Sequence, residues 1–135
     1  MLIALAVAAL FYTASNGYFG SSSEKTDYVN ETVYDAPVFD HFSFDIIEKP
    51  QVSGVPFTVT IRALDQYGRQ FTGYMGVNIL ECTNGEITPF STGVFLFGIW
   101  TGKVTVTGSV TDTTITTTAQ SNPAKTGTSN TFNVA

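Results

Sequence analysis

Few residues in this sequence could carry out acid–base or metal chemistry, and they are scattered. The chain contains one histidine, His41, which follows Asp40, and one cysteine, Cys82. A metal site needs several such ligands at defined spacings, and neither residue has a second partner of its own type. His41 falls on the outward parity of a predicted strand, so we expect it at the surface. The sequence therefore predicts no catalytic residue, no cofactor, no metal site and no enzyme.

A group of carboxylates lies between residues 35 and 48. Catalysis by such groups requires a cleft that shifts their pKa values, and the sequence around them indicates none. We interpret them as a solvated face. Asp65 precedes Gly68 without the dense acidic spacing of a calcium loop, and this pattern is typical of a turn. The carboxylates of the predicted solvated face are Asp35, Asp40, Asp45 and Glu48.

Two further side chains could form covalent bonds. Cys82 has no second cysteine to pair with in the chain. We expect it to be a small, half-buried apolar residue, and an intermolecular disulfide or a reactive thiol is the alternative. Lys103 could form an isopeptide crosslink to an asparagine, but the parity of its strand places it on the outside. The sequence therefore favours ordinary structural roles for both residues.

The composition separates this chain from nucleic-acid-binding proteins. Charged residues make up 13% of the sequence, and the net charge is −5. Ordinary soluble domains contain about 25% charged residues. The six lysines and arginines are scattered singly, whereas a nucleic-acid groove needs clustered basic residues. We therefore expect no nucleic-acid partner.

From Phe39 onward the hydrophobic residues alternate with polar ones, a period that is typical of half-buried strands. Strands are predicted over residues 57–63, 74–82, 86–88, 94–97, 100–107 and 113–119, beside a first strand near Phe42 and a last one near Phe132. A turn is predicted at Asn84-Gly85, and a loop over residues 122–127. Within 74–82, Val77 and Ile79 are expected on one face. The residues expected to point inward are Phe42, Phe44, Ile46, Phe57, Val59, Ile61, Ala63, Trp100, Val104, Val106 and Ile115, while Phe132 and Val134 are expected to close the last strand.

These elements amount to about seven strands, with turn signals every 8–12 residues. Such a pattern favours an antiparallel β-sandwich. The fold class predicted is therefore mainly β, with a hydrophobic α-helix before the sandwich. The domains predicted are an apolar helix over residues 1–19, a polar linker over 20–38 and a β head over 39–135.

The helix is predicted from the apolar run of residues 1–12. A secretory signal, a membrane anchor, a domain-core helix and an assembly helix are the alternatives. No Lys or Arg occurs before Lys25, so the basic region of a signal is missing. The run is shorter than the roughly 20 residues of a membrane span. A helix that is apolar all round must be buried all round, which favours packing against other copies. The expected assembly residues are Leu2, Ile3, Leu5, Val7, Leu10, Phe11 and Tyr12.

The predicted linker carries two further features. Asn30-Glu31-Thr32 fits the acceptor pattern for N-linked glycans, which makes Asn30 a candidate glycosylation site. Residues 28–34 could instead add as a strand to the sheet of a neighbouring subunit.

The β part resembles extracellular Ig-like modules of the invasin type. The residues that carry the resemblance are 54–61 (GVPFTVTI), 63–68 (ALDQYG), 98–106 (GIWTGKVTV) and 127–134 (GTSNTFNV). The resemblance implies an Ig-like sandwich at the cell surface, where such modules serve adhesion, spacing and assembly.

The layout of an apolar N-terminus followed by a β head also resembles archaeal type IV pilins and archaellins. This resemblance implies a structural subunit of an extracellular filament, a helical homopolymer held by its N-terminal helices after transient residence in the membrane. The alternative is a monomeric cell-surface Ig-like adhesion or spacer module with a short hydrophobic anchor. A secreted enzyme is a third, more distant hypothesis.

Overall fold

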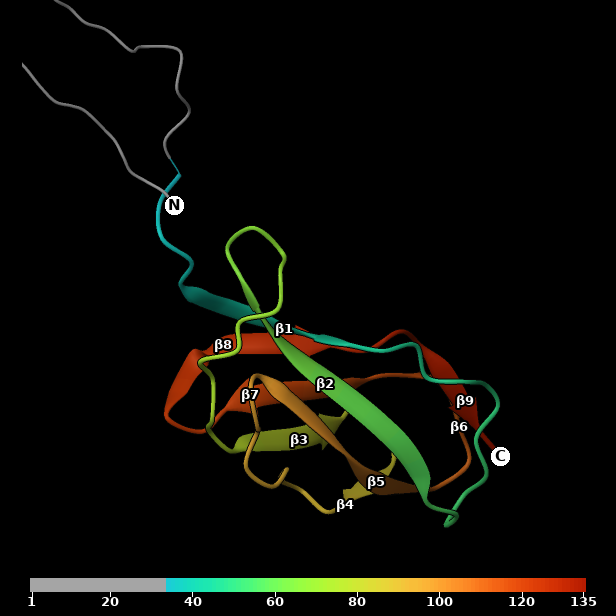
Figure 1. Ribbon diagram of the computed structural model, residues 1–135. Helices are drawn as coiled ribbons and strands as arrows, with labels where there is room; N and C mark the ends of the chain where they lie inside the picture. The colour runs from blue at the N-terminus through green and yellow to red at the C-terminus, as the bar shows by residue number, and fades with distance from the viewer. Residues whose placement is uncertain (1–33) are drawn as a thin grey trace, which may run out of the picture. The chain divides into compact units, whose positions relative to one another are not determined.

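The computed structural model describes residues 34–135, and residues Ala36–Ala135 form one compact unit built from strands (Figure 1). The predicted helix over residues 1–19, the assembly residues within it and Asn30 lie outside the described residues. The strands are β1 (Phe39–Phe44), β2 (Phe57–Asp65), β3 (Asn78–Cys82), β4 (Glu86–Thr88), β5 (Ile99–Thr107), β6 (Val110–Thr113), β7 (Ile115–Ala119), β8 (Asn122–Thr128) and β9 (Phe132–Val134).

The strands pair in antiparallel order. One sheet has the order β1-β2-β5-β4, a second has the order β3-β7-β8, and β6 pairs with β9. The prediction of a mainly β, antiparallel fold is therefore confirmed. The described part contains nine strands rather than about seven, because β6 is an additional strand that ends at Thr113 and because β8 occupies a predicted loop.

The core lies between the two larger sheets. β2 alternates as its sequence predicts, and every second residue from Phe57 to Asp65 is buried. Side chains from β2, β5, β3 and β7 meet in one cluster, which includes Ile61, Val104, Leu80 and Ile115. Burial of each large apolar side chain stabilises the fold by roughly 1.5–3 kcal/mol. The buried core residues are Phe42, Ile47, Phe57, Val59, Ile61, Ala63, Leu80, Phe95, Val104, Val106, Ile115, Ala119, Phe132 and Val134.

One side of the sandwich is closed by β1 and β8. A Cβ at Gly127 would overlap the backbone carbonyl of Phe42, so the two strands approach as closely as they do because Gly127 has no side chain. The prediction of a loop over residues 122–127 is wrong, because these residues belong to β8. Cross-strand pairing of Thr116 with Thr128 and Thr118 with Thr126 extends the sheet to this edge, and a register shift near Asn122 accommodates the Asn-Pro sequence.

The predicted inward position of Ile46 is also wrong. Its side chain is 78% exposed, and Ile47 is buried instead. The regular alternation ends with β1 at Phe44. Asn130 then accepts a hydrogen bond from the Ile47 N–H at 2.8 Å and donates one to the Ile47 carbonyl at 3.0 Å. These two bonds replace strand pairing and fix which of the two isoleucines points inward.

The strand predicted over residues 74–82 begins only at Asn78. Asn78 and Leu80 point into the core, whereas Val77 and Ile79 are half-buried on the other face. Trp100, which was predicted to lie in the core, is half-buried and packs against the edge of the cluster. At Asn78 the backbone N–H donates to the Thr92 hydroxyl at 2.9 Å, a contact from another segment that the local pattern does not contain.

Candidate interaction surface

Large apolar side chains are exposed along the connection between β4 and β5. Phe97 is 72% exposed, Leu96 60%, and Met75 from the β2–β3 connection 60%. Val94 is exposed on the same connection. We call Met75, Val94, Leu96 and Phe97 the apolar face. The two stretches that carry it, residues 70–80 and 87–102, contain no charged residue.

The two stretches lie side by side. The N–H of Phe95 donates to the carbonyl of Gly76 at 2.9 Å, and the N–H of Gly98 donates to the carbonyl of Tyr74 at 3.1 Å. Met75 therefore lies between the two bonded positions, next to Leu96. Phe95 is buried while Val94 and Leu96 are exposed. Residues 94–97 were predicted as a strand. They belong to no strand, because Leu96 forms only an isolated bridge with Ile99 and Phe97 lies in a turn, so that prediction is wrong.

Phe97 occupies an unusual backbone conformation at the tip of this connection. Phe97 and Gly98 have φ angles of 53° and 81°, and a β-bridge joins Leu96 to Ile99 on either side of them. Two consecutive residues with positive φ are typical of a type I′ hairpin turn, where Asn-Gly is the preferred pair. A phenylalanine in the left-handed region costs about 1–2 kcal/mol. The fold therefore holds an exposed aromatic side chain where a small residue would be more stable.

Neighbouring segments fix this turn from both sides. The carbonyl of Gly98 accepts a hydrogen bond from the Ala63 N–H at 2.8 Å. The carbonyl of Phe97 accepts one from the Gln70 side chain at 3.0 Å. A Cβ at Gly98 would overlap the carbonyl oxygen of Phe71. The position of Phe97 thus depends on the segment that follows β2.

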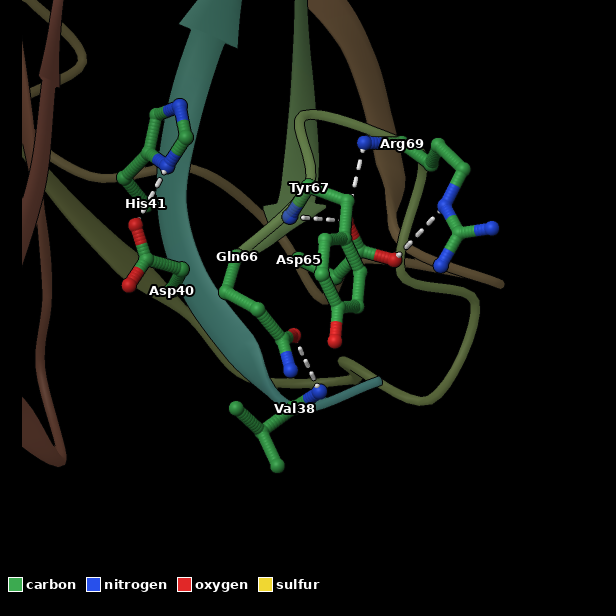
Figure 2. Close-up of polar contacts among 7 residues, drawn as sticks. All are labelled: Val38, Asp40, His41, Asp65, Gln66, Tyr67 and Arg69. Carbon is green, nitrogen blue, oxygen red and sulfur yellow. Dashed lines mark hydrogen bonds and ion pairs between the residues drawn. The ribbon is translucent and has the colours of Figure 1, made fainter. Parts of the chain in front are cut away.

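That segment is folded by Asp65, the last residue of β2 (Figure 2). The Asp65 side chain is buried and accepts hydrogen bonds from the N–H groups of Tyr67 at 2.8 Å and Arg69 at 2.9 Å. The Arg69 guanidinium lies 3.4 Å from the second carboxylate oxygen and 4.9 Å from the centre of the Tyr67 ring. Burial alone would raise the pKa of Asp65, but the two backbone donors and the Arg69 charge outweigh it and lower this pKa.

Gln66 links the same turn to the chain that enters β1. Its side chain accepts a hydrogen bond from the Val38 N–H at 2.8 Å (Figure 2). It also donates to the Ala36 carbonyl at 2.9 Å. The entry of the chain and the β2–β3 turn therefore lie at one end of the sandwich.

The stability of the domain should fall in acid partly through Asp65. Because the folded-state pKa is lowered, its contribution is present above the ordinary pKa of about 3.9 and is lost as the pH falls through the folded value. Asp65→Asn should lower Tm at pH 7 and flatten the decline of Tm below pH 4. Thermal melts across this pH range test the prediction, and Asp40→Asn, at an exposed site, is the control. An unchanged acid slope in Asp65→Asn would show that Asp65 does not stabilise the turn.

The residues singled out for their chemistry are dispersed. The His41 side chain is 45% exposed, which confirms its surface position, and within the described residues it pairs with Asp40 at 2.8 Å. Asp45 forms two hydrogen bonds with Arg62 at 3.0 and 3.1 Å, and these bonds lower the pKa of Asp45. Cys82 is half-buried, as predicted, and contacts the Asn84 carbonyl. Lys103 is exposed, as its parity predicted.

Residues 34–135 contain no cluster of three histidine, cysteine or acidic side chains placed to hold a metal ion. The same residues include no helix long and apolar enough to span a membrane. Sequence reasoning missed the apolar face, although the charge-free stretch at residues 87–102 was a signal for it.

Comparisons with solved structures find β-rich surface-layer domains. The chain is similar to the S-layer protein SbsC domains 4 and 5, with 21% identity, a TM-score of 0.46 and coverage of 74% of this chain and 54% of that one. It is also similar to SbsC domains 5–6, with 22% identity, a TM-score of 0.47 and coverage of 74% of this chain and 45% of that one. A third similar structure is rSbsC(31-844), with 23% identity, a TM-score of 0.47 and coverage of 85% of this chain and 15% of that one. The chain spans about half of the first two. At this level the likeness concerns the fold alone.

No family model and no curated protein sequence matches the chain.

The predicted relationship to archaeal pilins and archaellins is wrong, because the solved structures that match are S-layer domains. The prediction of a filament subunit that polymerises through its N-terminal helix depended on that relationship and is corrected with it. The pilin resemblance misled the prediction because a β-sandwich head is common to many surface proteins and does not distinguish among them. The expected cell-surface location agrees with the surface-layer proteins found.

Proposed function

We propose that this chain is a structural module of the cell surface, an Ig-like sandwich that contacts a neighbouring protein through the apolar face. The single observation that carries the proposal is the apolar face itself. Four large apolar side chains are exposed together on two charge-free stretches, and the backbone beneath them is fixed by hydrogen bonds. Exposed patches of this kind, held on a rigid scaffold, are typical of protein contact sites.

The strand order supports the Ig-like part of the proposal. A constant-type Ig sandwich has strands A, B, E and D in one sheet and C, F and G in the other. Here β1, β2, β5 and β4 form one sheet and β3, β7 and β8 the other. With β6 and β9 as additions, β1 to β5 take the places of A to E, and β7 and β8 those of F and G. The apolar face then lies on the B–C and D–E connections.

The surface location rests on the sequence. The motifs of residues 54–61 and 98–106 resemble extracellular modules, and the low charge and abundant threonine suit a surface covered by neighbours or sugars. Residues 34–135 contain no group of histidine, cysteine and acidic side chains placed to hold a metal ion, and their single histidine lies at the surface, so a spacer or adhesion role fits the described residues better than a hydrolytic one.

Lysine labelling of intact cells tests the proposed location. Lys49 and Lys103 are exposed on the β domain, so a membrane-impermeant amine reagent should label both on intact cells that carry the native protein. Peptide mass spectrometry after labelling gives the modified positions. Labelling of a cytoplasmic marker provides the control for cell integrity. If both lysines react only after lysis, the chain is not a cell-surface module.

A further inference from the structure

We propose that Asn84 is a site of spontaneous deamidation, which converts it to aspartate and isoaspartate in the folded protein. The backbone nitrogen of Gly85 attacks the side-chain carbonyl carbon of Asn84, a C–N bond forms and ammonia leaves, so that the two residues share a cyclic succinimide. Water then opens the ring at one of its two carbonyl carbons, which gives aspartate or isoaspartate. Water is the only other reactant. This inference is independent of the proposed function.

The sequence Asn84-Gly85 brings the two reacting groups together. Glycine has no Cβ, so no side chain on the second residue crowds the approach of its nitrogen to the asparagine side chain. Both residues are exposed, and they lie in the turn between β3 and β4. Gly85 has a φ of 84°, and a Cβ there would lie 2.9 Å from the Thr107 carbonyl oxygen. The turn that requires a glycine at position 85 therefore also creates the reactive pair.

The fold leaves both reacting groups free. Within residues 34–135 the Asn84 side chain forms no hydrogen bond, and the Gly85 N–H donates none. The turn is held through the backbone of Asn84 instead. Its N–H donates to the Thr113 hydroxyl at 3.2 Å, and its carbonyl accepts from that hydroxyl at 3.1 Å and from the Cys82 thiol at 2.8 Å. The side chain can therefore turn toward the Gly85 nitrogen without breaking a contact.

The other four asparagines of the described part lack this combination. Hydrogen bonds hold the side chains of Asn78, Asn130 and Asn133. Each of these three also precedes a β-branched residue, whose stiff side chain crowds the attacking nitrogen. Asn122 precedes Pro123, which has no N–H to lose. The fold and the sequence together therefore single out Asn84.

The two products should differ in stability. Aspartate at position 84 keeps the backbone contacts with Thr113, because only a side chain without hydrogen bonds has changed. Isoaspartate carries the chain through the side-chain carbon, which lengthens the backbone and displaces the carbonyl from the Thr113 hydroxyl. Thr113 is fully buried, and a buried hydroxyl that loses its partner destabilises the fold. Asn84→Asp should therefore keep the Tm of the wild type, whereas chains with isoaspartate should melt at a lower temperature.

Incubation of the full chain in mildly alkaline buffer tests the proposal, with peptide mass spectrometry as the readout. Asn84 should convert at least about tenfold faster than any other asparagine of residues 34–135, which corresponds to a barrier about 1.4 kcal/mol lower. An isoaspartyl methyltransferase, which methylates isoaspartate and not aspartate, should label position 84. Asn84→Gln is the control variant, because its longer side chain closes a less favourable ring, and it should show no conversion at this position.

The same incubation in urea separates the effect of the fold from that of the sequence. Unfolding should change the rate at Asn84 by less than about tenfold, and it should speed conversion at Asn130 and Asn133, whose side chains the fold holds. Asn16-Gly17, the second Asn-Gly pair of the sequence, lies outside the described residues and is scored separately. No conversion at Asn84 in the folded chain, over a period in which the unfolded chain converts there, overturns the proposal. A product without isoaspartate also overturns it.

Discussion

Gly98→Ala should destabilise the β domain by about 2–5 kcal/mol, the sum of left-handed strain and overpacking. Gly98 has a φ of 81°, and a Cβ there would overlap the Phe71 carbonyl oxygen. The clash is with backbone, so no side-chain rotation can relieve it. Urea denaturation gives the free energy of unfolding for comparison with the wild type.

Gly68→Ala is the matched control for Gly98→Ala. Gly68 has nearly the same φ, 80°, but a Cβ there meets nothing within 4 Å. Its replacement should therefore cost only the left-handed strain, about 1–2 kcal/mol. Equal losses in the two variants would contradict the close packing of the β4–β5 turn against Phe71. A larger loss at Gly98 would show that this packing holds Phe97 in place.

Asn78→Ala should cost about 2–4 kcal/mol, since it leaves more than one buried polar group without its partner. The Tyr74 hydroxyl donates to the Asn78 side-chain oxygen at 2.6 Å, and the Asn78 amide donates to the Thr117 hydroxyl at 2.9 Å. Asn78 is fully buried and joins β3 to β7 and to the segment before β3. Equilibrium unfolding in urea measures the loss.

Tyr74→Phe provides the comparison for Asn78. It removes one hydroxyl, so its cost should be smaller, and the double variant should cost less than the sum of the single ones because the two residues share a bond. Burial raises the pKa of Tyr74, so the phenol stays a neutral donor at physiological pH. Strictly additive losses would show that the hydrogen bond between the two side chains does not contribute to stability.

Local alternation was sufficient to predict the strands whose buried face is mostly apolar. β2 is the clearest case, because Phe57, Val59, Ile61 and Ala63 all point inward as expected. Alternation failed where a polar residue occupies the core. Asn78 can be buried because its side-chain amide forms hydrogen bonds with the hydroxyls of Tyr74 and Thr117. The apolar pattern of residues 74–82 does not indicate that these hydrogen bonds form.

Long-range backbone contacts account for the other errors. Asn130 selects Ile47 over Ile46 from far along the chain. Residues 122–127 have the composition of a loop, yet pairing with β7 and the close approach of Gly127 to β1 make them a strand. In each case the deciding partner is distant in sequence, so a local window could not identify it.

The apolar face could be predicted only in part. Absence of charge over residues 87–102 is visible in the sequence, but a charge-free stretch is equally compatible with a buried strand. The burial of Phe95 and the type I′ geometry at Phe97-Gly98 decide the outward direction of the apolar side chains. These side chains are Val94, Leu96 and Phe97. The pairing of this segment with Met75 comes only from the fold.

Photo-crosslinking on intact cells tests the central claim most directly. A photoreactive amino acid at position 97 should join this chain to a neighbouring protein, and the same group at position 46 should not, although Ile46 is the more exposed residue. Crosslinking to a neighbouring protein from position 97, with none from position 46, is the result we predict. Equal crosslinking from the two positions, or none from position 97, would contradict the claim that the apolar face is a contact surface.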